Sequence, residues 1–147
     1  AGLREEIAGF EQRLRRGLGV LRHVEDPRPG ATPRQCVFEI EGVRLYRYGE
    51  APPRPDAVPL LIVYALVNRP DMADLQAGRS LVAALMARGF DVYLVDWGYP
   101  GGADRLLGLE DYVCRYLDAC VEHLRRTLAR PALPLLGICQ GGTLSLS

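Results

Sequence analysis

The protein is a chain of 147 residues, of which 48% are hydrophobic and 24% are charged, so it can form one modest core and lacks the composition of a disordered chain. Its 18 basic and 18 acidic residues cancel, which argues against nucleic acid or an anionic membrane as a partner. No apolar run reaches the roughly 20 residues that span a bilayer. The four cysteines form no dense or paired motif, which favours a reducing, cytoplasmic location.

The first segment predicts an amphipathic helix and a linker. Apolar residues recur with helical spacing from Leu3 to Leu21, with arginine and glutamate between them. A linker follows at Asp26-Pro27-Arg28-Pro29-Gly30, where two prolines and a glycine stop any helix. We therefore divide the chain into residues 1–33, a leader helix and linker, and residues 34–147, the N-terminal part of an α/β domain.

The α/β domain is predicted to begin with strands of two kinds. Residues from Gln35 to Tyr48 partly alternate between apolar and charged side chains and are interrupted at Glu41-Gly42, as in a β-hairpin. Residues from Leu60 to Val67 form a continuous apolar run, which predicts a strand buried on both faces. Strands of this second kind are typical of parallel sheets.

Helices and buried strands then alternate to the end of the chain. A helix is predicted from Ser80 to Arg88, with a stop at Gly89, and the next buried strand runs from Asp91 to Trp97. A long helix with one broad apolar face follows from Leu109 to Leu128, and the third core strand runs from Leu135 to Ile138. This β-α-β-α-β order predicts right-handed crossovers and a doubly wound, mostly parallel sheet.

A nucleophile motif follows the third core strand directly. The sequence Gly137-Ile138-Cys139-Gln140-Gly141-Gly142 matches the elbow pattern G-x-nucleophile-x-G, with cysteine in the place usually held by serine. The nucleophile of an elbow lies on a strained turn, so side chains two residues away would strike the strand or the next helix. Cys139 is therefore the candidate catalytic residue, and a buried cysteine in a glycine-rich turn is the alternative.

A nucleophile that attacks a carbonyl group needs an oxyanion hole. The backbone N–H of Gln140, at the start of the following helix, is expected to supply one donor. The second donor is expected from the loop after the first core strand, at the Val67 backbone N–H, with Asn68 as the adjacent alternative. An ordinary strand-to-helix turn is the competing interpretation of this loop.

The sequence contains no good candidate for the base that would activate the thiol, whose pKa is about 8.5 when free. His23 and His123 both precede Cys139. In proteins with this elbow motif, the acid and then the histidine follow the nucleophile along the chain. We expect a surface or boundary role for His123. Cys120 shares its helix face, but two ligands make no zinc site, so neither a metal nor a cofactor is predicted. Asp96 ends a core strand, where a turn hydrogen bond is a simpler role than catalysis.

Four segments of the chain resemble the polyhydroxyalkanoate synthases, most of all their class III catalytic subunits, called PhaC. They are Pro59 to Ser80, Asp91 to Pro100, Leu109 to Val113, and Leu135 to Gly142. The resemblance implies an α/β-hydrolase fold and an acyltransferase in which Cys139 attacks the thioester of (R)-3-hydroxyacyl-CoA, with 3-hydroxybutyryl-CoA expected. It further implies polyester granules in the cytoplasm and a PhaE-type second subunit. The CoA thioester is the substrate, so no separate cofactor is implied.

The aspartate and histidine of that family lie beyond Ser147. We therefore expect the fold to be incomplete after the elbow and these 147 residues to be inactive by themselves. Two other functions stay open from the sequence. One is a cysteine hydrolase or thioesterase of the same fold, which would release acid instead of polymer. The other is a non-catalytic domain that binds a partner subunit or a storage granule.

Overall fold

The computed structural model describes residues 9–10, 12, 30, 32–54, 56–67 and 69–147. Gly9, Phe10 and Gln12 are helical. The rest of the predicted leader helix and most of the linker lie outside the described residues, and so does His23. No helix in the described ranges is long and apolar enough to cross a membrane.

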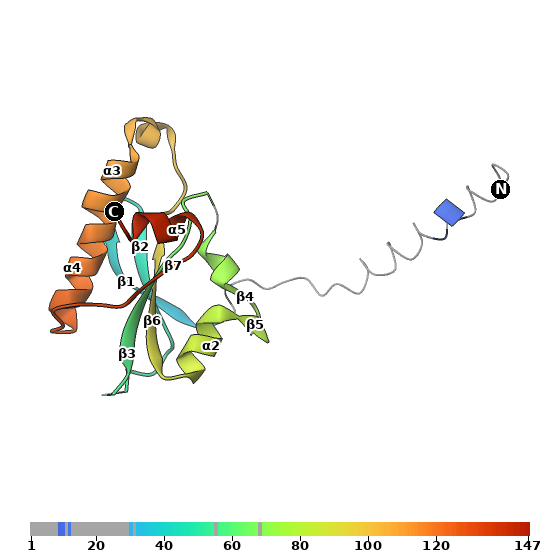
Figure 1. The fold of residues 1–147 in the computed structure, drawn as a ribbon, viewed down its shortest axis with the longest axis horizontal. Coiled ribbons are helices and arrows are strands. Elements are labelled where there is room, and N and C mark those ends of the chain that lie inside the picture. Colours follow the sequence, from blue (N-terminus) through green and yellow to red (C-terminus); the bar gives the residue numbers. More distant parts are fainter. Residues whose placement is uncertain (1–8, 11, 13–29, 31, 55, 68) are drawn as a thin grey trace.

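A mixed five-stranded sheet forms the centre of the domain (Figure 1). Its strands, in spatial order, are β1 (Arg34–Ile40), β2 (Val43–Tyr48), β6 (Phe90–Asp96), β3 (Val58–Val63) and β7 (Leu135–Gly137). β1, β2 and β6 pair antiparallel, whereas β6, β3 and β7 pair parallel. The three core strands predicted from the sequence are therefore adjacent and parallel, and the predicted hairpin extends the sheet on one side.

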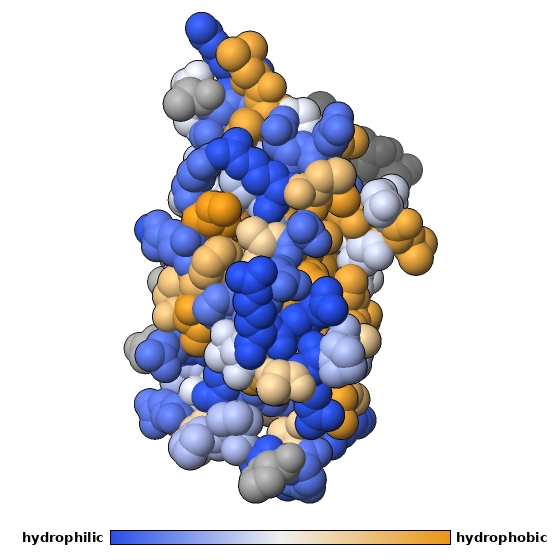
Figure 2. Space-filling view, turned by 90° about the vertical axis from the view of Figure 1, so that its left-hand side faces the viewer, coloured by the Kyte–Doolittle hydropathy of each residue, from blue (hydrophilic) through white to orange (hydrophobic). Residues whose placement is uncertain are grey.

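Helices cover both faces of the sheet, as predicted for a doubly wound fold (Figure 1). The helical elements are α2 (Leu81–Ala87), α3 (Leu109–Asp111), a π-helical segment (Tyr112–Leu117), α4 (Asp118–Thr127) and α5 (Gln140–Leu144). Alternate strand residues separate onto two cores. Leu61 and Val63 pack with the π-helical segment and α4, whereas Ile62 packs with Val82 of α2. Figure 2 shows the side on which α3 and α4 lie, where hydrophilic side chains run down the centre and hydrophobic ones flank them.

Local signals account for the ends of two elements. Ser80 caps α2, because its Oγ accepts a hydrogen bond from the Ala83 N–H at 2.9 Å, and Gly89 follows the helix with a φ of 94°. Glu41 and Gly42, between β1 and β2, have φ angles of 49° and 89°. Two positive φ angles are typical of the tight turn in a β-hairpin, as the break in the alternating pattern predicted.

Two features differ from the sequence-based expectation. β3 ends at Val63 rather than at Val67, because the carbonyl of Tyr64 and the N–H of Leu66 bind side chains outside the sheet. The long helix contains the π-helical turn from Tyr112 to Leu117, which a 3.6-residue periodicity does not reveal. Two short strands, β4 (Asp74–Gln76) and β5 (Arg79–Ser80), and two 3-10 helices, Pro70–Ala73 and Gly102–Leu106, complete the domain.

Candidate active site

Cys139 lies on a sharp turn between β7 and α5. Its φ of 57° and ψ of −127° lie outside the regions that residues other than glycine readily adopt. Its side chain is exposed, just after β7, which pairs in parallel with β3 at one edge of the described sheet. The backbone is therefore strained at the one residue that the sequence motif selects, and the strain turns a thiol toward the surface.

Two glycines make this turn possible. A Cβ atom on Gly141 would lie 1.9 Å from the carbonyl oxygen of Val63, and a Cβ atom on Gly137 would lie 2.4 Å from the Cα of Gly142. Both distances are far shorter than any real carbon contact, so the predicted reason for glycine at these positions is confirmed. Gly142 differs, because a Cβ atom there would meet the Gly137 carbonyl oxygen at an ordinary 3.8 Å.

The backbone N–H groups after the nucleophile have distinct roles. The N–H of Gly141 donates to the carbonyl oxygen of Ile138, and the N–H of Gly142 donates to that of Cys139, both at 3.0 Å. These two donors close the turn. The N–H of Gln140, directly after the nucleophile and at the first position of α5, stays the predicted oxyanion donor from this element.

The loop after β3 is tied down at two points. The indole Nε1–H of Trp97 donates to the carbonyl oxygen of Tyr64 at 2.9 Å. The backbone N–H of Leu66 donates to the side-chain Oε1 of Gln140 at 3.1 Å. The Leu66 N–H is therefore engaged, and the next N–H along the loop belongs to Val67, which stays the predicted second donor. Asn68 lies outside the described residues.

The side chain of Gln140 was not singled out by the sequence motif. Motif reasoning assigned a role only to its backbone N–H, since any side chain fits the pattern at that position. The structure shows that the amide also joins the elbow to the loop after β3. A glutamine directly after the nucleophile indicates that its side chain can form a hydrogen bond near the site. The sequence does not indicate which backbone group it contacts.

The remaining candidate residues have structural roles. The ring of His123 stacks on that of Phe38, with 4.6 Å between centroids and 20° between planes, which is the boundary role expected for it. Cys120 is fully buried, and burial raises the pKa of its thiol to about 12. A carboxylate oxygen of Asp96 accepts the N–H of Gly98 at 3.0 Å, as predicted for a turn. The described part of the chain contains no group of three or more His, Cys, Asp or Glu that could hold a metal ion.

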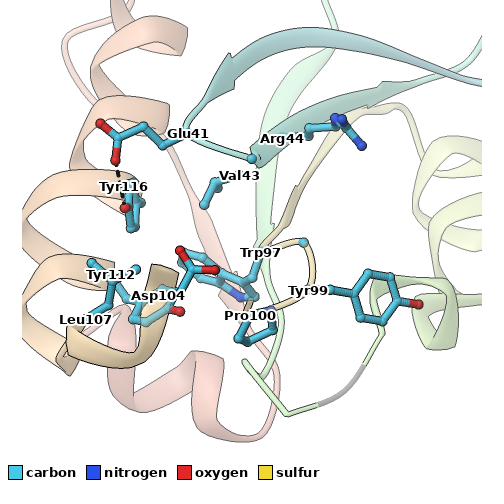
Figure 3. A pocket seen from close by; sticks show the side chains of 12 residues that line it. Glu41, Val43, Arg44, Trp97, Tyr99, Pro100, Asp104, Leu107, Tyr112 and Tyr116 are labelled. Carbon is cyan, nitrogen blue, oxygen red and sulfur yellow. Dashed lines mark hydrogen bonds between the residues drawn. The ribbon is translucent and has the colours of Figure 1, made fainter. Parts of the chain in front are cut away.

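A cavity of about 230 Å³ lies between the β1–β2 hairpin, the loop after β6 and the π-helical segment (Figure 3). The phenol O–H of Tyr116 donates to Glu41 at 3.1 Å, and the rings of Trp97 and Tyr112 meet edge to face at 5.7 Å. These groups bind one another across three elements. The contact with Tyr112 therefore supports the position of Trp97, whose indole N–H binds the loop after β3.

A mixed sheet with parallel core strands, covered by helices on both faces and carrying a strained cysteine between a core strand and the next helix, defines an α/β hydrolase. Residues 58–147 match the α/β hydrolase fold family, and the chain belongs to it.

Within this fold, the chain is homologous to a polymerase. It is 47% identical over 146 residues to poly(3-hydroxyalkanoate) polymerase subunit PhaC of Allochromatium vinosum, which is 98% of this chain and 41% of that protein. It is 48% identical over 143 residues to the subunit of the same name from Synechocystis sp., which is 96% of this chain and 38% of that protein. The PhaC subunit of Thiocystis violacea is 44% identical over 145 residues. The predicted resemblance is confirmed, over about two fifths of these relatives' length.

Proposed function

We propose that the full-length protein is an acyltransferase that polymerises (R)-3-hydroxyacyl-CoA into polyhydroxyalkanoate and releases CoA. The exposed Cys139 on its strained turn carries this proposal, because an elbow places a nucleophile where a carbonyl carbon can approach it. The similarity to PhaC polymerases supports the choice of reaction. We propose a short acyl chain, with 3-hydroxybutyryl-CoA as the substrate.

The proposed reaction begins when the Cys139 thiolate attacks the carbonyl carbon of the CoA thioester. The negative charge that develops on the carbonyl oxygen is stabilised by the backbone N–H groups of Gln140 and Val67. Collapse of the tetrahedral intermediate breaks the bond to the CoA sulfur, so that CoA leaves as a thiolate and the acyl group is held as a thioester of Cys139. A hydroxyl group of another acyl unit then loses its proton and attacks this thioester, which forms the more stable ester and frees the Cys139 sulfur.

We place the base for these proton transfers outside the 147 residues. The ring of His123 is stacked on Phe38 of β1, and β1 lies at the opposite edge of the described sheet from β7, which leads into Cys139. The word subunit in the names of the PhaC relatives supports a second polypeptide, which we propose is of the PhaE type. We further propose that the enzyme works in the cytoplasm at the surface of polyester granules.

The decisive experiment supplies the full-length protein with 3-hydroxybutyryl-CoA and measures both the thiol of released CoA and the mass of polymer. We expect release with polymer, and loss of both in Cys139→Ala, with Cys36→Ala as the control because Cys36 is also an exposed thiol. Release of CoA with free acid and no polymer would establish the alternative function as a thioesterase. Full activity of Cys139→Ala, with iodoacetamide labelling Cys139 no faster than Cys36, would refute Cys139 as the nucleophile. No release of CoA by the wild-type protein would support the alternative of a non-catalytic binding domain.

A further inference from the structure

A cavity of about 640 Å³ opens beside the loop after β3, at the edge of the sheet where the parallel strands β3 and β6 end. Ligands of open α/β sheets bind at this carboxyl edge. The residues that matter here are Arg34, Arg44 and Tyr46 from the β1–β2 hairpin, Val67 and Arg69 from the loop after β3, and Tyr99 from the loop after β6. We call this space the arginine cavity.

Guanidinium groups outnumber carboxylates in the lining of the arginine cavity, by three to one. Asp71 is shared by two guanidinium groups, with 3.1 Å to Arg34 and 3.6 Å to Arg69, so this cluster of three charges is positive by one unit. Arg44 is paired separately, with Glu39 at 3.0 Å. Asp96 is the one carboxylate among the described residues that line the cavity, and it accepts the Gly98 N–H of its own turn.

The two guanidinium groups that share Asp71 are held in place. Arg34 lies over the ring of Tyr46 at 4.4 Å, and Arg69 lies over the ring of Tyr99 at 4.9 Å. In Figure 3, Tyr99 and Arg44 lie on the side of Trp97 that faces away from Glu41 and Tyr116. Each guanidinium has five N–H donors. Both contact Asp71, and Arg34 also donates to the Tyr48 hydroxyl at 3.4 Å, which leaves other donors for a ligand. Restraint before binding lowers the entropy lost when an anion is bound.

We propose that the arginine cavity binds the phosphate groups of the CoA part of the substrate. This inference rests on the proposed function, because it takes an acyl-CoA as the ligand. The acyl group and the pantetheine arm are uncharged, so the phosphates are the anionic groups that such a substrate offers to arginine. Val67, whose N–H is the proposed donor to the thioester oxygen, lines the same cavity. The cavity therefore borders the loop that carries one of the two proposed oxyanion donors.

The test compares two thioesters on the full-length enzyme: 3-hydroxybutyryl-CoA, and 3-hydroxybutyryl-pantetheine, which has no phosphate. In Arg34→Gln and in Arg69→Gln we expect KM for the CoA thioester to rise about tenfold, with kcat within about twofold, because each variant loses a charge-assisted hydrogen bond. KM for the pantetheine thioester should stay unchanged. Arg88→Gln is the matched control, because Arg88 is exposed on the C-terminal end of α2 and bonds to the carbonyl of Ala84.

Direct binding of 3′,5′-ADP, measured by calorimetry, separates the cavity from the reaction. We expect binding to the wild-type enzyme that is weakened about tenfold in Arg34→Gln and unchanged in Arg88→Gln. Equal rises of KM for both thioesters, or no rise for either, would overturn the role of the cavity. Absence of turnover with both thioesters in the wild-type enzyme would instead refute the proposed function, and the binding of 3′,5′-ADP would then decide about the cavity alone.

Discussion

The side-chain Oε1 of Gln140 accepts a hydrogen bond from the backbone N–H of Leu66 at 3.1 Å, across 74 positions of the sequence. This bond joins the first residue of α5 to the loop after β3. Gln140, whose side chain accepts this bond, carries one proposed oxyanion donor in its backbone N–H. The other proposed donor is the N–H of Val67, the residue directly after Leu66. The bond therefore links the two segments that carry the proposed donors.

Gln140→Met should weaken catalysis while leaving substrate binding almost unchanged. Methionine has a similar length but no strong acceptor, so the Leu66 N–H loses its partner and the loop can shift relative to the elbow. We expect kcat for 3-hydroxybutyryl-CoA to fall by about tenfold or more and KM to stay within about twofold. Thr143→Val, on the exposed side of the same helix, is the control. A wild-type kcat in Gln140→Met would contradict this positioning role.

Two neighbouring glycines should respond very differently to alanine. In Gly141→Ala the new Cβ would lie 1.9 Å from the Val63 carbonyl oxygen, so we expect the free energy of unfolding to drop by about 3 kcal/mol and activity to be lost. In Gly142→Ala the nearest atom is 3.8 Å away, and alanine favours the helix, so stability should stay within about 1 kcal/mol of the wild type. Thermal denaturation of the full-length variants measures both. Equal melting temperatures would refute the steric explanation.

Trp97→Phe should remove the second contact that fixes the loop after β3, the hydrogen bond from Trp97 to Tyr64. Phenylalanine keeps an aromatic ring in the core but removes the indole N–H that binds the Tyr64 carbonyl at 2.9 Å. We expect a loss of about 1–3 kcal/mol in the free energy of unfolding, since a partly buried carbonyl is left without its donor. The loss should be accompanied by a lower kcat. Denaturant titration with a parallel kinetic assay checks this, and an unchanged stability would show that another group replaces the indole donor.

The buried thiol of Cys120 should make stability depend on alkaline pH. Burial raises its pKa to about 12 from a reference of 9.0, so above pH 9 the unfolded thiol ionises while the folded one keeps its proton. The unfolded state then binds fewer protons, and the free energy of unfolding falls as pH rises from 9 to about 12. Cys120→Ala should be less stable at neutral pH but show a shallower decline over this range. Denaturation at a series of pH values measures both slopes, and equal slopes would contradict the assignment.

Burial should also make Cys120 react with iodoacetamide far more slowly than the exposed cysteines. Cys139 and Cys36 are exposed, whereas Cys120 has no exposed surface and a raised pKa. At pH 8 we expect labelling of Cys120 only in denaturant, because alkylation needs an accessible thiolate. Peptide mass analysis after timed labelling checks this, with Cys36 as the internal standard. Rapid labelling of Cys120 in the native enzyme would show that α4 opens readily.

Local patterns were enough to predict the core strands, the helix after Ser80 and the elbow at Cys139. Burial on both faces makes a strand apolar over several consecutive residues, as in β3 and from Val92 to Val95 in β6. The collisions that a Cβ atom would make at Gly137 and Gly141 admit only glycine. Such requirements act on residues close together in the chain, so they remain visible in the sequence. The motif thus determined which residue is the candidate nucleophile.

The tertiary structure alone decided which side chains of separate elements meet at the elbow and at the loop after β3. The bond from Gln140 to Leu66, and the cluster of Arg34, Arg69 and Asp71, join residues from separate elements. A glutamine or an arginine satisfies its hydrogen bonds equally well with many partners, and neither periodicity nor spacing selects one. Only the packing of the loop after β3 against the elbow and the hairpin brings these groups within reach of one another.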